Sequence, residues 1–262
     1  ASIRAVFPDH PRIYVFDLGL TASQRFELRR VPWITFSEVP AFAPHWRLNW
    51  TWKHFIAQIP PERFILHIDS GVVLLRPLHL WFLEIAHNGY LAISQQQPLA
   101  DITPTDYWQL VGIDAETYGQ CDVIAAGIFG FDKQRPAGIA VSEACELAKA
   151  GWTLGCSPAE RNPVFDRSVA RDCPRFRHDQ TLLNLTLRRH YDNSLRIRPL
   201  ARFCGLNRRN DHPRQFVWWA RRRPECLIYF TQALHRRSVA HYFNRFTALT
   251  SIQWRQLARA CI

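Results

Sequence analysis

The chain has 262 residues, enough for one large domain or two small ones. Its hydrophobic fraction of 47% and charged fraction of 21% exclude a disordered chain and are typical of a folded globular protein. Thirty-three lysines and arginines against 22 acidic residues give a formal net charge of +11 at pH 7. This charge suits polyphosphate substrates, anionic membrane surfaces and nucleic acid equally well, so it selects none of them.

The seven cysteines are scattered and form no Cys-x-x-Cys pair. This argues against a disulfide framework and a structural zinc site, and favours a reducing compartment. No run of about 18 uncharged apolar residues occurs, so we expect no segment to span a bilayer. No secretory signal is visible either. The sequence contains no methionine, not even at position 1, so we expect the chain to be either processed or, as we favour, truncated at its N-terminus.

The first part of the chain alternates β-rich runs with helical runs. In chain order we expect a strand at 12–18, a helix at 23–30 capped by Ser23, a strand at 32–36, an aromatic-rich helix at 45–59, apolar strands at 63–68 and 72–75, a helix at 78–86 and a strand at 90–94.

The second part begins with residues 95–120, which are polar and expected to be irregular. There follow a strand pair, or a strand and a turn, at 123–131, a helix at 137–150, a long loop at 155–177, a helix at 179–191, short strands at 195–197 and 226–230, and a helix at 250–260. This alternation predicts a single α/β domain with a mostly parallel sheet flanked by helices.

The strand at 63–68 is followed at once by Asp69, Ser70 and Gly71. A carboxylate at the end of a strand is well placed to bind a metal at the carboxyl edge of an α/β sheet. The two small residues would leave room for a diphosphate, whose charge a divalent ion would offset. The alternative is that Asp69 only forms a turn.

Three polar residues open the helix at 179–191, namely His178, Asp179 and Gln180. Asp179 is a candidate base or partner of a sugar hydroxyl, Gln180 a partner of a hydroxyl, and His178 an acid, base or ligand. Arg175 and Arg177 precede them and would offset phosphate charge. The alternative is that Asp179 only caps the helix.

Two further residues are candidates for ligand binding. Lys53 is one of only three lysines and is expected either to contact a phosphate or to lie on a solvated helix face. His235 follows the expected strand at 226–230 and is a candidate to complete a metal site with Asp69. Motifs of serine hydrolases, P-loop kinases, dinucleotide-binding dehydrogenases and zincin proteases are missing from the sequence.

Taken in order, these motifs resemble those of GT-A-type glycosyltransferases. More narrowly, they resemble a little-characterised family in which a strand is followed by Asp-Leu-Gly-Leu-Ser/Thr. The matching segments are 15–21 together with Gln24, the Trp-Thr-Trp-Lys step at 50–53, 68–71, the Ala-Gly strand at 125–131, and the His-Asp-Gln helix start within 177–184.

The resemblance implies transfer of a sugar from a nucleotide-diphosphate donor to the hydroxyl group of an acceptor, in glycan or polysaccharide synthesis. It implies catalytic roles for Asp179, Gln180 and His178, and Mn²⁺ or Mg²⁺ held by Asp69 and His235. The residues expected to bind the donor are Asp17, Lys53, Asp69, Ser70, Gly71, Gly127 and Arg177. We expect such an enzyme in the cytoplasm or at the inner face of a membrane, peripherally attached.

The chain departs from the family pattern in two places. Gly71 stands where many such enzymes have a second aspartate, and the usual first strand has no counterpart before residue 12. These departures leave open a domain that binds glycans or nucleotides without turnover. A nucleic-acid-binding module is a further alternative that rests on the arginine content alone. It should carry an aromatic-basic motif or a recognition helix, and we find neither, so no nucleic-acid partner is expected.

Overall fold

The computed structural model describes Ile3, residues 7–74, 76–155, 173 and 175–199, and the backbone of 204–205 and 217–219. The described chain belongs to two compact units. The larger comprises Arg12–His67 and Trp81–Pro199, and the smaller comprises Ala1–Pro11, Ile68–Leu80 and Leu200–Ile262. The expected strand at 226–230, the helix at 250–260, most of the loop at 155–177 and His235 lie outside the described residues.

The larger unit begins with two parallel strands, β1 (Ile13–Asp17) and β2 (Ile34–Glu38), joined through helix α2 (Ala22–Arg29). The helix is capped by Thr21, two residues before the expected Ser23. The Thr21 hydroxyl accepts a hydrogen bond from the Gln24 amide, and the Gln24 side chain accepts one from the Thr21 amide. This reciprocal capping box requires a glutamine or glutamate three residues after the cap, which Ser23 lacks.

The second sheet of this unit has the strand order β3-β6-β5, built from β3 (Phe64–Ile68), β6 (Asp122–Asp132) and β5 (Tyr90–Pro98). β5 and β6 are antiparallel, with register shifts after Ala92 and Ser94. Both alternatives predicted for 123–131, a strand pair or a strand and a turn, are wrong. The segment lies within the single central strand β6, whose apolar run is continuous because the strand is buried from Val123 onward.

Residues 95–120 are ordered, contrary to expectation. β5 runs to Pro98 and is followed by the 3₁₀ helix η1 (Leu99–Ile102) and helices α5 (Thr105–Val111) and α6 (Ala115–Tyr118). The buried residues of α5 have helical spacing: Tyr107, Trp108 and Val111. This spacing is the sequence pattern that indicates a helix here. The expected strand at 195–197 is also wrong, since the chain there makes a single parallel bridge between Ile93 and Arg198.

The smaller unit contains a third sheet. β4 (Val72–Leu74) pairs antiparallel with β8 (Val217–Trp219), which pairs parallel with β7 (Cys204–Gly205). Helix α4 (His79–Asn88) follows β4 along the chain. The described strands thus form small parallel and antiparallel sheets flanked by helices. The α/β class is confirmed. The described strands form three small sheets in place of the predicted single, mostly parallel sheet.

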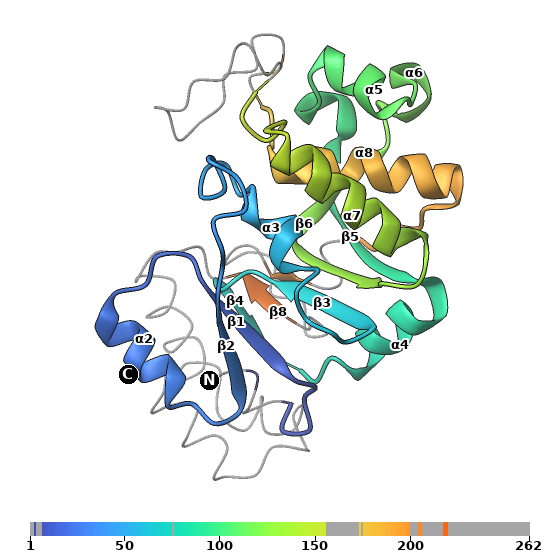
Figure 1. The fold of residues 1–262 in the computed structure, drawn as a ribbon. Coiled ribbons are helices and arrows are strands. Elements are labelled where there is room, and N and C mark those ends of the chain that lie inside the picture. Colours follow the sequence, from blue (N-terminus) through green and yellow to red (C-terminus); the bar gives the residue numbers. More distant parts are fainter. Residues whose placement is uncertain are drawn as a thin grey trace. The chain divides into compact units, whose positions relative to one another are not determined.

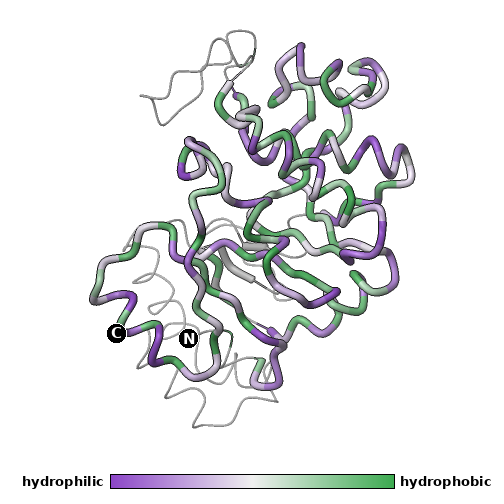
Figure 2. The backbone as a smooth tube through the Cα atoms, in the orientation of Figure 1, coloured by the Kyte–Doolittle hydropathy of each residue, from purple (hydrophilic) through white to green (hydrophobic). Residues whose placement is uncertain are grey.

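Helices α7 (Pro136–Lys149) and α8 (Asp179–Tyr191) lie side by side over β6 (Figure 1). Hydrophobic and hydrophilic residues alternate along these helices (Figure 2). Every residue of α8 from Asp179 to Arg188 is buried, although six of these ten are polar or charged. Buried polar groups need hydrogen-bond partners, so α8 must find them in the elements around it.

The expected helix at 45–59 is reduced to α3 (Trp52–Ile56). Asn49 and Trp50 have φ of 48° and 57°, values of the left-handed region that interrupt a right-handed helix. The chain from 43 to 51 therefore forms turns. This break directs Trp50 and Lys53 to positions that a continuous helix would not give them.

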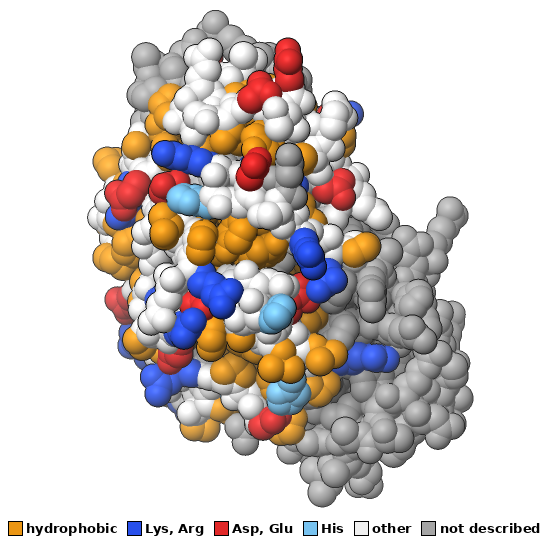
Figure 3. Space-filling model, turned by 90° about the vertical axis from the view of Figure 1, so that its right-hand side faces the viewer, with side chains coloured by type: hydrophobic (Ala, Val, Ile, Leu, Met, Phe, Trp, Pro, Cys, Tyr) orange, Lys and Arg blue, Asp and Glu red, His pale blue; other side chains and the backbone are white. Residues whose placement is uncertain are grey.

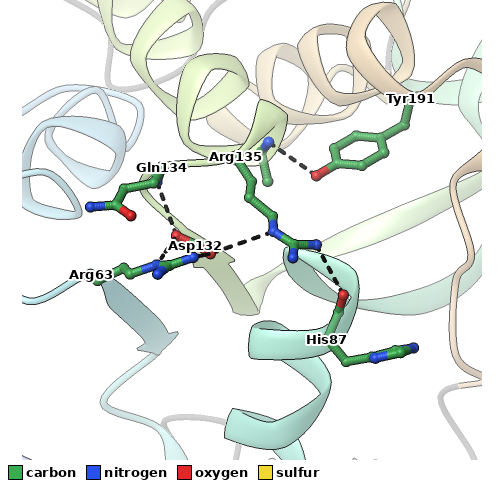
Figure 4. A network of polar contacts seen from close by, with 7 residues as sticks. Arg63, His87, Asp132, Gln134, Arg135 and Tyr191 are labelled. Atoms are coloured by element: carbon green, nitrogen blue, oxygen red, sulfur yellow. Dashed lines mark hydrogen bonds and ion pairs between the residues drawn. The ribbon is translucent and has the colours of Figure 1, made fainter.

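A buried carboxylate ties the end of β6 to its neighbours (Figure 4). Asp132 is fully buried and accepts hydrogen bonds of 2.8–3.1 Å from the guanidinium of Arg63 and one of 3.0 Å from the Gln134 amide. The Arg63 hydrogen bonds hold the pKa of Asp132 below its usual range. Arg135 completes the network by donating to the carbonyl of His87 at 3.0 Å.

Candidate functional site

The 178–180 segment lies at the start of α8 and contacts α3. The N-cap residue is His178, with φ of 50° and ψ of −113°, and no side chain caps the helix. The alternative that Asp179 serves only as the helix cap is therefore wrong. Its Oδ2 lies instead 3.2 Å from Nζ of Lys53, and we refer to these two residues as the Lys53–Asp179 pair.

The Lys53–Asp179 pair is buried on both sides, with side chains 9% and 6% exposed. The alternative that Lys53 lies on a solvated helix face is wrong. Oδ2 of Asp179 accepts no hydrogen bond from the described residues, so the Lys53 ammonium approaches it outside hydrogen-bond geometry. Removing two charges from water is costly, and the buried Asp179 Oδ2 lacks a hydrogen bond from the described residues to offset its part of that cost, so this pair lowers the stability of the fold.

His54 also contacts the Lys53–Asp179 pair, although it was not among the predicted site residues. Its Nε2 lies 3.0 Å from the carbonyl oxygen of Asp179, and because a carbonyl only accepts, Nε2 carries the hydrogen. Burial lowers the pKa of His54 to about 4, although the Asp179 carboxylate and carbonyl act in the opposite direction. The imidazole is therefore neutral at physiological pH and acts as a fixed donor.

A small cavity adjoins the pair. Its volume is about 20 Å³, enough for one water molecule and far too small for a sugar nucleotide. Its polar lining comes from three residues, Lys53, His54 and His67. Its apolar lining comes from the end of α3 and from β6, α7 and α8: Ala57, Ala126, Phe129, Phe131, Val141 and Leu183. A ligand as large as a sugar nucleotide would therefore have to bind outside this cavity.

Gln180 and Asn184 hold α8 to β6. Nε2 of Gln180 donates to the carbonyl of Ile124 at 2.7 Å and to Oε1 of Gln95 at 2.8 Å. Asn184 accepts from the Ile124 amide at 2.7 Å and donates to the Ile124 carbonyl at 3.1 Å. Both groups of Ile124 are thus satisfied where the β5–β6 register shifts. The role of Asn184 was not predicted, although it lies one helical turn after Gln180.

His178 is oriented by its surroundings. Its Nδ1 donates to the carbonyl of Thr153 at 2.9 Å, and its ring packs on Trp50, with 5.4 Å between ring centroids. Backbone strain gathers around it. Of the five described non-glycine residues with positive φ, Asn49, Trp50 and His178 belong to these contacting segments, and Gln96 adjoins the partner of Gln180. Strained conformations persist where the surrounding fold enforces them, and they gather at functional sites.

The remaining predicted donor-binding residues of the larger unit are dispersed. Asp17 ends β1, and its Oδ1 accepts from the amides of Gly19 at 2.9 Å and Leu20 at 2.8 Å. These hydrogen bonds lower the pKa of Asp17, and Arg25 pairs with its Oδ2 at 2.7 Å. The structure therefore gives Asp17 a role in closing the turn before α2.

Gly127 is buried in the middle of β6, in the strand that Gln180 and Asn184 contact. Arg175 is exposed and pairs with Asp101 at 2.9 Å. Arg177 is also exposed, and its guanidinium has no ion-pair partner among the residues that the structure describes. Of the two predicted phosphate-binding arginines, Arg177 is thus the one whose charge is uncommitted within the described chain.

Asp69, Ser70 and Gly71 belong to the smaller unit, in the turn between β3 and β4. Asp69 is half-buried and its carbonyl accepts from the Val72 amide at 3.0 Å, so this residue does form a turn. The described residues contain no group of three or more His, Cys, Asp or Glu able to hold a metal ion. Within the described part of the chain, Asp69 therefore does not belong to a set of three or more such ligands.

Sequence comparison adds no assignment. No protein-family model matches the chain, and no curated protein is significantly similar to it. Among the described helices, none is both long and apolar enough to cross a membrane.

Proposed function

We propose that the chain is a nucleotide-sugar-dependent glycosyltransferase with a GT-A-like α/β fold, working at the Lys53–Asp179 pair. One observation carries the proposal. The Trp-Thr-Trp-Lys step and the His-Asp-Gln helix start, two separate motifs of the family that the sequence resembles, meet in a buried ion pair of 3.2 Å. A structural ion pair alone would not require strained backbone at Trp50 and His178, on both sides of the contact.

In this proposal Asp179 faces the reacting sugar and stabilises its developing positive charge or takes the proton of the acceptor. Lys53 holds the carboxylate in place, and His54 fixes the backbone carbonyl of the same residue. The Gln180 amide nitrogen is committed to Ile124 and Gln95, so its Oε1 is the group left for a sugar hydroxyl. Positioning by such a rigid first helical turn lowers the entropic part of the barrier.

Arg177 supports donor binding in this proposal. Its exposed guanidinium directly precedes the 178–180 segment, and a planar guanidinium matches the oxygens of a diphosphate. Gly127, Ser70, Gly71 and Asp17 stay predicted donor contacts.

Asp69 is the residue that would hold Mn²⁺ or Mg²⁺. A half-buried carboxylate is a hard oxygen ligand of the kind these ions take, and Mg²⁺ is commonly bound by one or two carboxylates together with substrate phosphates. The ion would supply neutralisation of the charge on the departing diphosphate. His235 stays a predicted second ligand outside the described residues.

A binding domain without turnover is the second candidate, favoured by the small size of the cavity and the burial of Asp179. A nucleic-acid-binding role has less support. On the face drawn in Figure 3, basic, acidic and hydrophobic side chains of the described residues are interspersed and form no continuous basic stripe there. Such a stripe is the usual footprint of nucleic-acid binding.

The test compares Asp179→Asn with Asp132→Asn, a matched change at another buried, ion-paired carboxylate. Hydrolysis and transfer from UDP- and GDP-sugars would be measured with Mn²⁺ and with Mg²⁺. We expect Asp179→Asn to lose at least about a hundredfold in turnover and Asp132→Asn to keep it per folded molecule. Equal turnover in wild type and Asp179→Asn would refute the catalytic assignment. Binding of UDP or GDP without any turnover would favour the second candidate.

A further inference from the structure

Trp50 is an aromatic residue that the fold holds outward. Its side chain is 42% exposed. The neighbouring aromatics of the same stretch, Phe42, Trp46, Trp52 and Phe55, instead pack into one hydrophobic cluster around Val39 and Ile56. Because an indole gains stability from burial, keeping Trp50 outside the adjacent cluster forgoes part of that stabilisation.

The backbone fixes this exposure. Asn49 and Trp50 are consecutive left-handed residues, a conformation that asparagine tolerates and tryptophan rarely adopts. The turn is fastened on both sides. The Trp50 carbonyl accepts from the Lys53 amide at 2.9 Å, and the Thr51 hydroxyl bonds to the Leu48 carbonyl at 2.7 Å. Thr51 also bonds to the Thr153 hydroxyl. Trp50 is thus presented on a rigid, strained support.

His178 sets the orientation of the indole. The two rings lie 5.4 Å apart with an interplanar angle of 39°, and His178 is itself fixed by Thr153 and by Phe176, 4.9 Å away. The same residue directly precedes Asp179 in the chain. The exposed indole therefore flanks the start of α8, one residue from the proposed reacting centre.

We infer that Trp50 is a stacking platform for a pyranose ring of the acceptor glycan. The C–H face of a pyranose packs on an indole, while the hydroxyl groups at its edge need polar partners. The exposed guanidinium of Arg177, next to His178 in the chain, is a donor in this stretch. This inference rests on the proposed function, since that function makes a sugar the expected neighbour of Asp179. A nucleobase also stacks on tryptophan, and the experiment separates the two.

The experiment measures binding by ligand-observed NMR, without donor or metal. Cellobiose, lactose and maltose are the probes, with sorbitol as an acyclic polyol and uridine as a nucleobase. Trp50→Ala removes the platform, and Trp50→Phe keeps an aromatic face. Phe26→Ala is the matched control, because Phe26 is also an exposed aromatic residue, 59% exposed, and lies on α2. Circular dichroism confirms that each variant is folded.

We expect at least one disaccharide to bind, about tenfold more weakly to Trp50→Ala, and within roughly threefold of wild type to Trp50→Phe and Phe26→Ala. Sorbitol should not bind. Disaccharide binding that is absent, or equal in wild type and Trp50→Ala, would overturn the inference, as would Trp50-dependent binding of uridine alone.

The two proposals fail separately. Asp179-dependent donor hydrolysis combined with sugar binding indifferent to Trp50 would remove the platform and keep the enzyme. Trp50-dependent sugar binding without any hydrolysis would keep the platform and remove the enzyme.

Discussion

Removing one charge of the Lys53–Asp179 pair should destabilise the protein far more than removing both. Asp179→Asn preserves shape but leaves the Lys53 ammonium buried, with its side chain 9% exposed and no counter-charge at 3.2 Å. Lys53→Met leaves the carboxylate, 6% exposed, in the same position. For buried pairs, such single changes cost about 3–5 kcal/mol, whereas apolar or neutral replacement of both members is close to neutral. We therefore expect a coupling free energy of about 3 kcal/mol in the double-mutant cycle.

The assay is urea unfolding, followed by tryptophan fluorescence and far-ultraviolet circular dichroism. Coincident transitions would justify two-state treatment, and changes in the midpoint at constant slope would give each change in free energy. The Arg63–Asp132 pair serves as the control for burial. Arg63 is 47% exposed on its side chain, so water can solvate it after Asp132→Asn, and the loss should be smaller.

If the two changes had additive effects on the free energy of unfolding, Lys53 and Asp179 would not form a coupled buried pair, since additivity would mean that the two charges are not desolvated together. A cost below about 1 kcal/mol for Asp179→Asn would do the same. The double variant also separates structure from chemistry. It should regain most of the lost stability and still lack turnover, because the Asp179 carboxylate is missing. A double variant that is both stable and active would remove the pair from the proposed mechanism.

Three further predictions follow from the geometry. Burial lowers the pKa of His54 from 6.5 to about 4. Its contribution to the free energy of unfolding, about 3 kcal/mol, is therefore complete above pH 6.5 and is lost as the pH falls toward 4. Urea unfolding between these pH values should show this loss of stability in wild type and not in His54→Asn. Gly130→Ala would place a Cβ 2.3 Å from Cδ1 of Ile85 and should lower the free energy of unfolding by about 2 kcal/mol. A double variant with Ile85→Val should recover part of this loss. Equal melting temperatures of Gly130→Ala and wild type would contradict the close packing at Gly130. Trp50→Gly should be more stable than Trp50→Ala by about 1 kcal/mol, because glycine adopts φ of 57° without strain; the reverse order would contradict the left-handed backbone there.

Much of the secondary structure follows from local pattern. The apolar runs that became β1, β3 and β6, and the leucine spacing of α8, mark their elements because period and composition are properties of the chain itself. Breaks are harder to predict. Asparagine tolerates a left-handed conformation at position 49, but the composition of residues 45–59 does not indicate one at Trp50, where the surrounding fold enforces it. The register of β5 on β6, and with it the antiparallel pairing, likewise depends on contacts between distant residues.

For the candidate site, the sequence gives the residue types and singles out Lys53 and the start of α8 as candidates. The contacts of each side chain follow from the tertiary structure. It paired Lys53 with Asp179, committed the Gln180 amide to β6, and added His54 and Asn184. Burial and hydrogen-bond partnership are relations between distant segments, so a local pattern does not reveal them. A one-dimensional pattern fixes the donors and acceptors, whereas the packing of α3, α8 and β6 fixes which of them meet.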